Sequence, residues 1–111
     1  MQYLLLIYEN EKRFSQGYDK AEMGEYHAFG EEFAKSIKGA NALQATGTAK
    51  SVRVRNGKIA TTDGPFAETK EQLGGYYLVE AGDIAEATKV AAKIPGARFG
   101  TIEVRPIMTF S

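Results

Sequence analysis

The sequence feature that most constrains the fold is a β-hairpin signal over residues 51–62. Asn56-Gly57 is typical of a two-residue type I′ turn, and the residues on either side alternate between apolar and polar. Paired residues share a face, so the turn places four side chains on the face that we expect to point inward. They are Val52, Val54, Ile59 and Thr61. Continuing the alternation puts Asp63 on the same inward face, at the end of the second strand, unless Gly64 introduces a β-bulge one residue early.

Four further segments have the composition of β-strands. Residues 2–8 and 73–80 are apolar at both odd and even positions, which predicts central strands covered on both faces. Residues 101–105 alternate cleanly between apolar and polar, and residues 42–46 form a short possible strand. Together with the hairpin, these segments predict a sheet.

Two segments show the period of an amphipathic helix. The first spans residues 20–38, and Gly39 is expected to end it. Its core-facing arc consists of Met23, Tyr26, Gly30, Phe33, Ala34 and Ile37. A second helix begins after Asp83, a typical N-cap residue, and stops at Pro95.

The order of these elements is strand, helix, hairpin, strand, helix, strand. It predicts an α+β fold, a ferredoxin-like βαββαβ sandwich with an extra β-hairpin. At 111 residues and 43% hydrophobic content, the chain suits a single domain over residues 1–111. Two helices cannot cover both faces of the sheet, so we expect a homodimer that packs sheet against sheet.

The composition narrows the classes of function. Lys and Arg number 14, as do Asp and Glu, so the chain lacks the net positive charge that draws a protein to nucleic acid or to an anionic membrane. With one histidine and no cysteine, a haem or metal could be held only by mixed carboxylate ligation, and we expect neither a metal nor a cofactor. The longest apolar run, Tyr3 to Tyr8, is far below the ~20 residues of a membrane span. The absence of cysteine suits a cytoplasmic protein.

A nine-residue loop carries the most specific motif in the chain. It reads Asp63-Gly64-Pro65-Phe66-Ala67-Glu68-Thr69-Lys70-Glu71. With residues 73–80 and 100–106, it resembles the YCII-related proteins of the DGPF subgroup. The resemblance covers nearly the whole chain and implies a bacterial cytoplasmic protein with a dimeric α+β barrel fold. It also implies an association with extracytoplasmic-function sigma factors, although the chain contains no recognisable DNA-binding motif.

The resemblance also points to candidate catalytic residues. Shorter YCII-like relatives carry a His and Asp pair in a cleft, with the His in the first helix, and His27 occupies a comparable place here. Asp63 belongs to the signature itself. A carboxylate that faces an apolar cleft would have a raised pKa suited to acid/base work. The structural alternatives are a turn-capping role for Asp63 and simple packing for His27.

Three further residues are candidates for ligand contact. Tyr76 and its neighbour Tyr77 point to opposite faces, so that one packs in the core or interface and the other can line a cleft. Phe66 is expected to pack the loop onto the sheet, and Lys70 either contacts a substrate or is solvated.

The sequence leaves two functions open. One is a small-molecule enzyme without cofactor that uses His27 and Asp63 for proton transfer, isomerisation or elimination near a dimer interface. The other is a non-catalytic ligand-binding or interaction module that serves a sigma factor.

Overall fold

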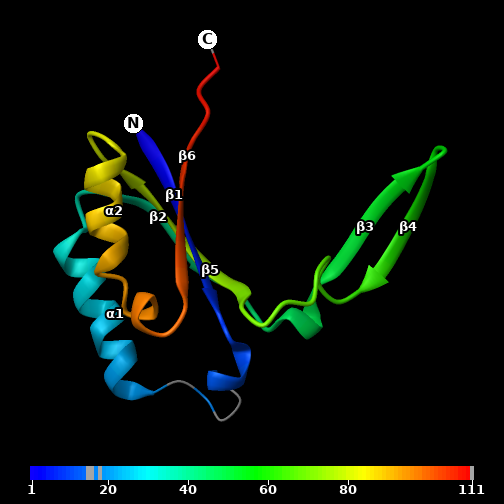
Figure 1. Ribbon diagram of the computed structural model, residues 1–111, viewed down its shortest axis with the longest axis horizontal. Helices are drawn as coiled ribbons and strands as arrows, with labels where there is room; N and C mark the ends of the chain where they lie inside the picture. The colour runs from blue at the N-terminus through cyan, green and yellow to red at the C-terminus, as the bar shows by residue number, and fades with distance from the viewer. Residues whose placement is uncertain (15–16, 18, 111) are drawn as a thin grey trace.

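The computed structural model describes residues 1–14, 17 and 19–110. Within these described residues, two α-helices, three 3₁₀ turns and six strands follow one another (Figure 1). In order they are β1 (Gln2–Glu9), η1 (Glu11–Phe14), α1 (Lys20–Glu32), β2 (Ile37–Ala42), η2 (Thr46–Thr48), β3 (Lys50–Arg55), β4 (Lys58–Asp63), β5 (Gln72–Glu80), α2 (Ile84–Ala92), η3 (Pro95–Arg98) and β6 (Thr101–Pro106).

Four of the strands form one antiparallel sheet in the order β2-β5-β1-β6. Both α-helices lie on the same side of it (Figure 1). With the β3–β4 hairpin inserted between β2 and β5, this is the ferredoxin-like α+β arrangement that the order of elements predicts. The predicted fold class is therefore confirmed.

The core lies between this sheet and the two helices. Tyr3, Leu5 and Ile7 alternate along β1 on the side that faces the helices, and all three are buried. Phe29 of α1 packs edge-on against Tyr77 of β5, with ring centroids 4.9 Å apart. Complete burial of a leucine side chain contributes about 1.5–3 kcal/mol to the free energy of unfolding, so this layer is the main source of stability.

The opposite face of the sheet, here called the open face, is also apolar. Leu4 pairs with Leu78 and Leu6 pairs with Tyr76 on this side, and all four are only partly buried. Among the described residues, both α-helices lie on the other side of the sheet. The predicted two-faced character of β1 and β5 is therefore present in the structure.

The hairpin has the predicted turn and register. Asn56 and Gly57 both adopt positive φ angles, 54° and 75°, as a type I′ turn requires. The register runs from Arg55 paired with Lys58 to Val52 paired with Thr61, as the position of the turn predicts. The hairpin is nevertheless a separate two-stranded sheet that projects away from the molecule (Figure 1). Residues 50–63 are called the arm below.

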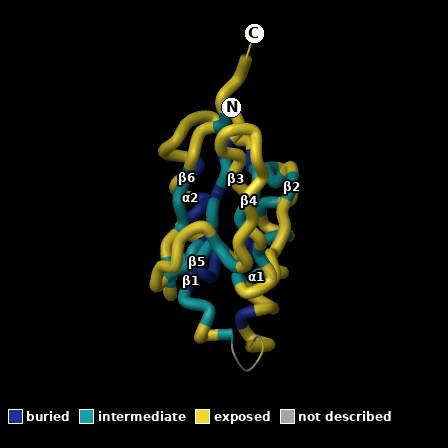
Figure 2. Tube along the Cα trace, turned by 90° about the vertical axis from the view of Figure 1, so that its right-hand side faces the viewer, coloured by how far each residue is buried: buried dark blue, intermediate teal, exposed yellow. Residues whose placement is uncertain are grey.

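The prediction that one face of the arm points into the core is wrong for the chain as described. Val52 and Val54 are more than half exposed and Ile59 is 74% exposed. Alternation identifies which side chains share a face, but it does not identify what covers that face. Figure 2 shows the exposed arm in front of the partly buried sheet.

The end of the first helix differs from the prediction. Helix α1 ends at Glu32, and residues 37–42, predicted as its last turn and the start of a later strand, instead form edge strand β2. Ile37 pairs with Val79 of β5, and the backbone of Ser36 accepts a 2.8 Å hydrogen bond from Glu80. Pairing with a central strand therefore outweighs the helical period of this segment.

The second helix begins as predicted, because the side chain of Asp83 accepts a 2.8 Å hydrogen bond from the backbone of Glu86. No helix within the described ranges is both long and apolar enough to cross a membrane.

Candidate functional site

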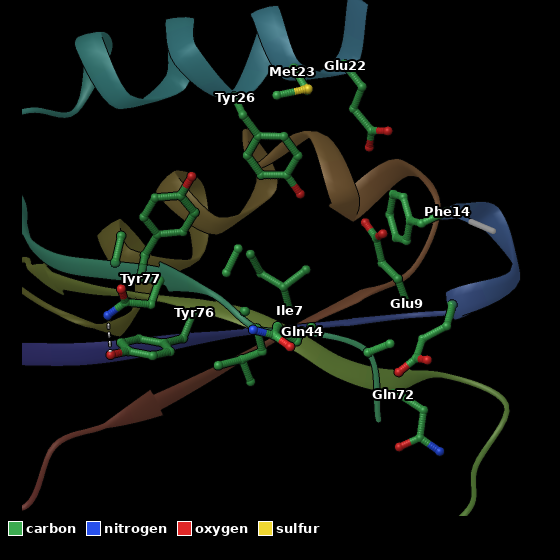
Figure 3. A pocket seen from close by; sticks show the side chains of 18 of the residues that line it. Ile7, Glu9, Phe14, Glu22, Met23, Tyr26, Gln44, Gln72, Tyr76 and Tyr77 are labelled. Carbon is green, nitrogen blue, oxygen red and sulfur yellow. Dashed lines mark hydrogen bonds between the residues drawn. The ribbon is translucent and has the colours of Figure 1, made fainter. Parts of the chain in front are cut away.

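A cavity of about 860 Å³ lies between α1 and one end of the sheet (Figure 3). Helix α1 contributes a wall that contains Met23 and Tyr26, and β5 contributes Tyr76 and Tyr77. The turn η1 and the loop after β2 form the remaining sides. The wall is mostly apolar and aromatic, with a few polar groups, which is the usual composition of a small-molecule site.

Glu9 is the most unusual residue of this wall. It is the last residue of β1 and continues the inward alternation of Leu5 and Ile7, so its carboxyl group points toward α1 and is only 5% exposed. Burial raises the pKa of Glu9, the Arg13 guanidinium opposes this rise, and the negative charge of Glu22 adds to it. Among the described residues, its Oε1 atom has no hydrogen-bond partner. A buried polar atom without a partner is rare in folded proteins and costs stability.

Two glycines provide the space for this carboxyl group. A Cβ atom on Gly96 would lie 2.2 Å from Oε1 of Glu9, and one on Gly100 would lie 2.9 Å from its Cγ. Gly96 belongs to η3 and Gly100 follows η3, so this turn is shaped to accept the Glu9 side chain.

Arg13 and Glu22 form an ion pair beside Glu9. Nη2 of Arg13 donates to both carboxylate oxygens of Glu22, at 2.8 Å and 3.0 Å, but lies 3.5 Å from Oε2 of Glu9. The guanidinium also stacks on the ring of Phe99, 3.9 Å from its centroid. Arg13 therefore compensates the buried charge of Glu22 more fully than that of Glu9.

Tyr26 is the fourth residue of the polar cluster that contains Glu9, Arg13 and Glu22. Its hydroxyl accepts a 3.2 Å hydrogen bond from the backbone N–H of Gly96. Burial and the nearby negative charge of Glu9 both raise the pKa of Tyr26, so the phenol keeps its proton at neutral pH. A protonated phenol and a carboxyl group thus project from opposite walls into the same region (Figure 3). This arrangement can donate one hydrogen bond to a ligand and exchange one proton with it.

The structure does not bring the predicted pair His27 and Asp63 together. His27 is 79% exposed at its side chain, and its Nε2 atom lies 2.7 Å from Glu31. Asp63 is 87% exposed at its side chain, and its Oδ1 atom lies 3.2 Å from Nζ of Lys50. Helix α1 and the arm lie on opposite sides of the main sheet (Figure 1), and neither residue is among those that line the cavity. The expectation that Asp63 points inward is wrong for the described chain, because β4 joins only β3.

Of the three predicted ligand contacts, Tyr76 lines the cavity. Its hydroxyl accepts a 2.9 Å hydrogen bond from Nδ2 of Asn41 on the open face, while Tyr77 packs on the core side, as the alternation predicts. Phe66 does not pack the loop onto the main sheet; its ring is 79% exposed, with the guanidinium of Arg53 5.3 Å from its centroid. Lys70 is exposed in the loop between β4 and β5 and lies outside the cavity wall.

Sequence reasoning missed Glu9, Arg13, Glu22 and the role of Tyr26. The signals are visible in retrospect as charged residues at core-facing positions. Glu9 has the parity of Leu5 and Ile7 along β1, and Glu22 precedes Tyr26 by one helical turn, on the same face of α1. Among the described residues, no three His, Cys, Asp or Glu side chains are grouped so that they could hold a metal ion.

The profile of the YCII-related domain matches residues 1–111. The chain belongs to the YCII-related family. This YCII-related chain is 40% identical, over 70 residues, to an uncharacterised protein of Rhizobium meliloti (strain 1021). The match covers 61% of the chain and spans only 56% of the length of that relative.

A solved structure has a similar fold. It is the 5-chloro-2-hydroxyhydroquinone dehydrochlorinase TftG of Burkholderia phenoliruptrix AC1100, in complex with 2,5-dihydroxybenzoquinone. The similarity covers 97% of this YCII-related chain and 94% of TftG, with a TM-score of 0.62 and 14% sequence identity. At this identity the comparison shows a shared fold and no more.

Proposed function

We propose that this protein is an enzyme that transfers protons on a small molecule without a cofactor, and that Glu9 is the acid/base group. The observation that carries the proposal is the buried Glu9 carboxyl group at the cavity wall, whose Oε1 atom has no hydrogen-bond partner among the described residues. A raised pKa brings a carboxyl group toward the working pH of a general acid or base.

The proposed reaction uses Glu9 and Tyr26 together. The Glu9 carboxylate removes a proton from one atom of the substrate, and the electron pair left behind moves onto a substrate oxygen that accepts a hydrogen bond from Tyr26. Protonated Glu9 then returns the proton at a second atom, which gives an isomerisation. Alternatively, the electron pair expels a leaving group, which gives an elimination. The phenol of Tyr26 stabilises the developing negative charge without giving up its own proton.

The cavity wall favours a small cyclic or aromatic substrate. Tyr26, Tyr76, Tyr77 and Phe14 provide aromatic surface, and the Gln44 and Gln72 side chains supply amide groups for substrate oxygens. The name of TftG, a dehydrochlorinase with the same fold, supports an elimination on a hydroxylated ring as one member of this class.

The test uses 2,5-dihydroxybenzoquinone as the probe. Wild-type protein in deuterated buffer should accelerate exchange of the ring protons, measured by NMR, and the probe should raise the melting temperature. Glu9→Gln keeps the size of the side chain but cannot exchange the proton, so we expect it to reduce the rate to the uncatalysed level. Glu68→Gln changes an exposed glutamate outside the cavity and is the matched control. Equal rates for Glu9→Gln and wild type would exclude Glu9 as the acid/base group.

The same assay separates the alternatives that the sequence leaves open. If His27 and Asp63 carry the reaction, His27→Ala and Asp63→Asn lose turnover while Glu9→Gln keeps it. If the protein is a non-catalytic module that serves a sigma factor, a ligand raises the melting temperature and no variant changes the background rate. We place the activity in a homodimer, because the open face of the sheet needs an apolar cover. We place this homodimer in the cytoplasm, since a chain without cysteine suits a reducing compartment.

A further inference from the structure

The arm makes the chain less compact than its length predicts. The radius of gyration is 15.9 Å, whereas a compact domain of this length has a value of about 13 Å. The molecule measures 46 × 46 × 19 Å, and the arm stands apart from the main sheet (Figure 1). Within the described residues, the arm pairs strand to strand only with itself.

Such an arm requires a cover. A two-stranded hairpin alone is marginally stable in water, because its few backbone hydrogen bonds do not offset the entropy lost on ordering. One face of this arm nevertheless carries Val52, Val54 and Ile59, all more than half exposed. An apolar face of this kind marks an interaction surface.

The distribution of charge indicates which molecule covers the apolar face of the arm. The arm carries four basic residues (Lys50, Arg53, Arg55 and Lys58) and one acidic residue, Asp63. Because the whole chain has 14 basic and 14 acidic residues, the rest of the chain holds ten basic and thirteen acidic residues. The arm and the rest of the molecule are therefore opposite in net charge, so an arm is electrostatically complementary to the body of a second copy.

The direction in which the arm projects is also consistent with a second copy of the chain as its partner. The arm stands on the side of the main sheet opposite to the helices, the side of the open face, in both views (Figures 1 and 2). A second copy that covers the open face therefore also lies next to the arm. In a dimer with two-fold symmetry, the arm of each copy would pack against the body of the other copy. Both arms would then be buried, so the assembly would stop at a dimer.

We propose that two copies of this chain exchange arms, and that the face with Val52, Val54 and Ile59 is buried against the body of the partner. Tyr76 lies on the open face and also lines the cavity, so the partner that covers this face forms part of the surroundings of the cavity. The arm exchange is independent of the proton-transfer chemistry, since it rests on the shape, apolar face and charge of the arm.

The experiment compares two neighbouring substitutions by sedimentation across a micromolar concentration series. Ile59→Glu places a charge on the apolar face of the arm, and we expect it to raise the dissociation constant of the dimer by roughly tenfold or more, as for a central interface residue. Ala60→Glu adds the same charge to the opposite face of the same strand, where Ala60 pairs with Arg53, and should weaken the dimer much less, because it lowers only the net charge of the arm. High salt should weaken the wild-type dimer, because it screens the attraction between arm and body.

Amide hydrogen exchange provides a second measurement. Backbone amides of β3 and β4 should be protected in the wild-type dimer and exchange quickly in Ile59→Glu. A wild-type protein that is monomeric throughout the series overturns the proposal, as does one whose arm binds a polyanion such as heparin and forms no dimer. A dimer that Ile59→Glu leaves unchanged also overturns it, because the interface would then be the open face alone. None of these outcomes depends on turnover of a substrate.

Discussion

Replacing Gly96 by alanine tests the construction of the cavity more directly than replacing an acidic residue. The new Cβ atom would lie 2.2 Å from Oε1 of Glu9 and 2.8 Å from the hydroxyl of Tyr26. Ordinary contacts of a Cβ atom begin near 3.4 Å, so the Glu9 carboxyl group must move by about 1.2 Å. The alanine therefore displaces both groups that we assign to proton transfer without removing either of them.

The expected cost follows from overpacking. Inserting a methyl group into a well-packed region costs about 1–3 kcal/mol of unfolding free energy. For a chain of this size, each kcal/mol lowers the melting temperature by about 4 °C, so Gly96→Ala should lower it by about 4–12 °C. The far end of the Glu9 side chain can rotate away, so we expect a value near the lower limit. The exchange rate with 2,5-dihydroxybenzoquinone should fall at least ~10-fold, as misplacement of catalytic groups by about 1 Å commonly causes.

The control is Gly24→Ala, on the exposed side of α1. Apart from its chain neighbours and the adjacent backbone of its own helix, no described atom lies within 4 Å of its new Cβ position. Alanine is also favoured over glycine in a helix by about 1 kcal/mol. This variant should be slightly more stable than wild type and equally active. If Gly96→Ala instead matches Gly24→Ala in both melting temperature and exchange rate, the tight contact between η3 and Glu9 is not present in solution. The assignment of Glu9 would then lose its geometric basis.

Two further predictions concern the buried residues of β1. Burial raises the pKa of Glu9 above its ordinary value of 4.5, so ionising Glu9 costs the folded state free energy. Below pH 4.5 the carboxyl group is protonated in both states. As the pH rises through the folded-state pKa, wild type should therefore lose stability relative to Glu9→Gln, measured by urea unfolding at acidic and mildly alkaline pH. A relative gain for wild type over this range would show that Arg13 outweighs the burial. Leu5→Ala should cost about 2–5 kcal/mol, measured as a shift of the urea midpoint, because Leu5 is completely buried. A loss below 1 kcal/mol would show that the core between sheet and helices collapses around the gap.

The parts of the fold that were predicted correctly are those with strong local signals. The Asn56-Gly57 turn requires two positive φ angles, and the observed angles and register follow from it. Asp83 caps α2 through a hydrogen bond that depends only on residues three positions apart. The order of these elements was enough to predict the ferredoxin-like arrangement.

The errors arise where tertiary contacts decide between local alternatives. The segment from Phe33 to Lys38 fits the helical period, yet Ile37 gains more by pairing with Val79 at the edge of the sheet. Asp63 follows the hairpin alternation to the face that we expected to be inward, but that face is exposed in the single chain. The hairpin pattern gives only the relative orientation of its side chains, and in both cases the surface that the segment packs against depends on residues far away in the chain.

The candidate site was missed because its signal is a violation of the core pattern. A charged residue at a core-facing position, such as Glu9, contradicts the hydrophobic alternation of β1, and the predicted strand over residues 2–8 ended one residue before it. Such violations reduce stability, so a folded protein retains them only when the surrounding structure accommodates them. Here that accommodation consists of Gly96 and Gly100, which leave space, and Arg13, which supplies a partial counter-charge. Two separate segments, η1 and the turn at η3, thus contribute to keeping one carboxyl group buried at the cavity wall, which favours a chemical role for Glu9 over a packing defect.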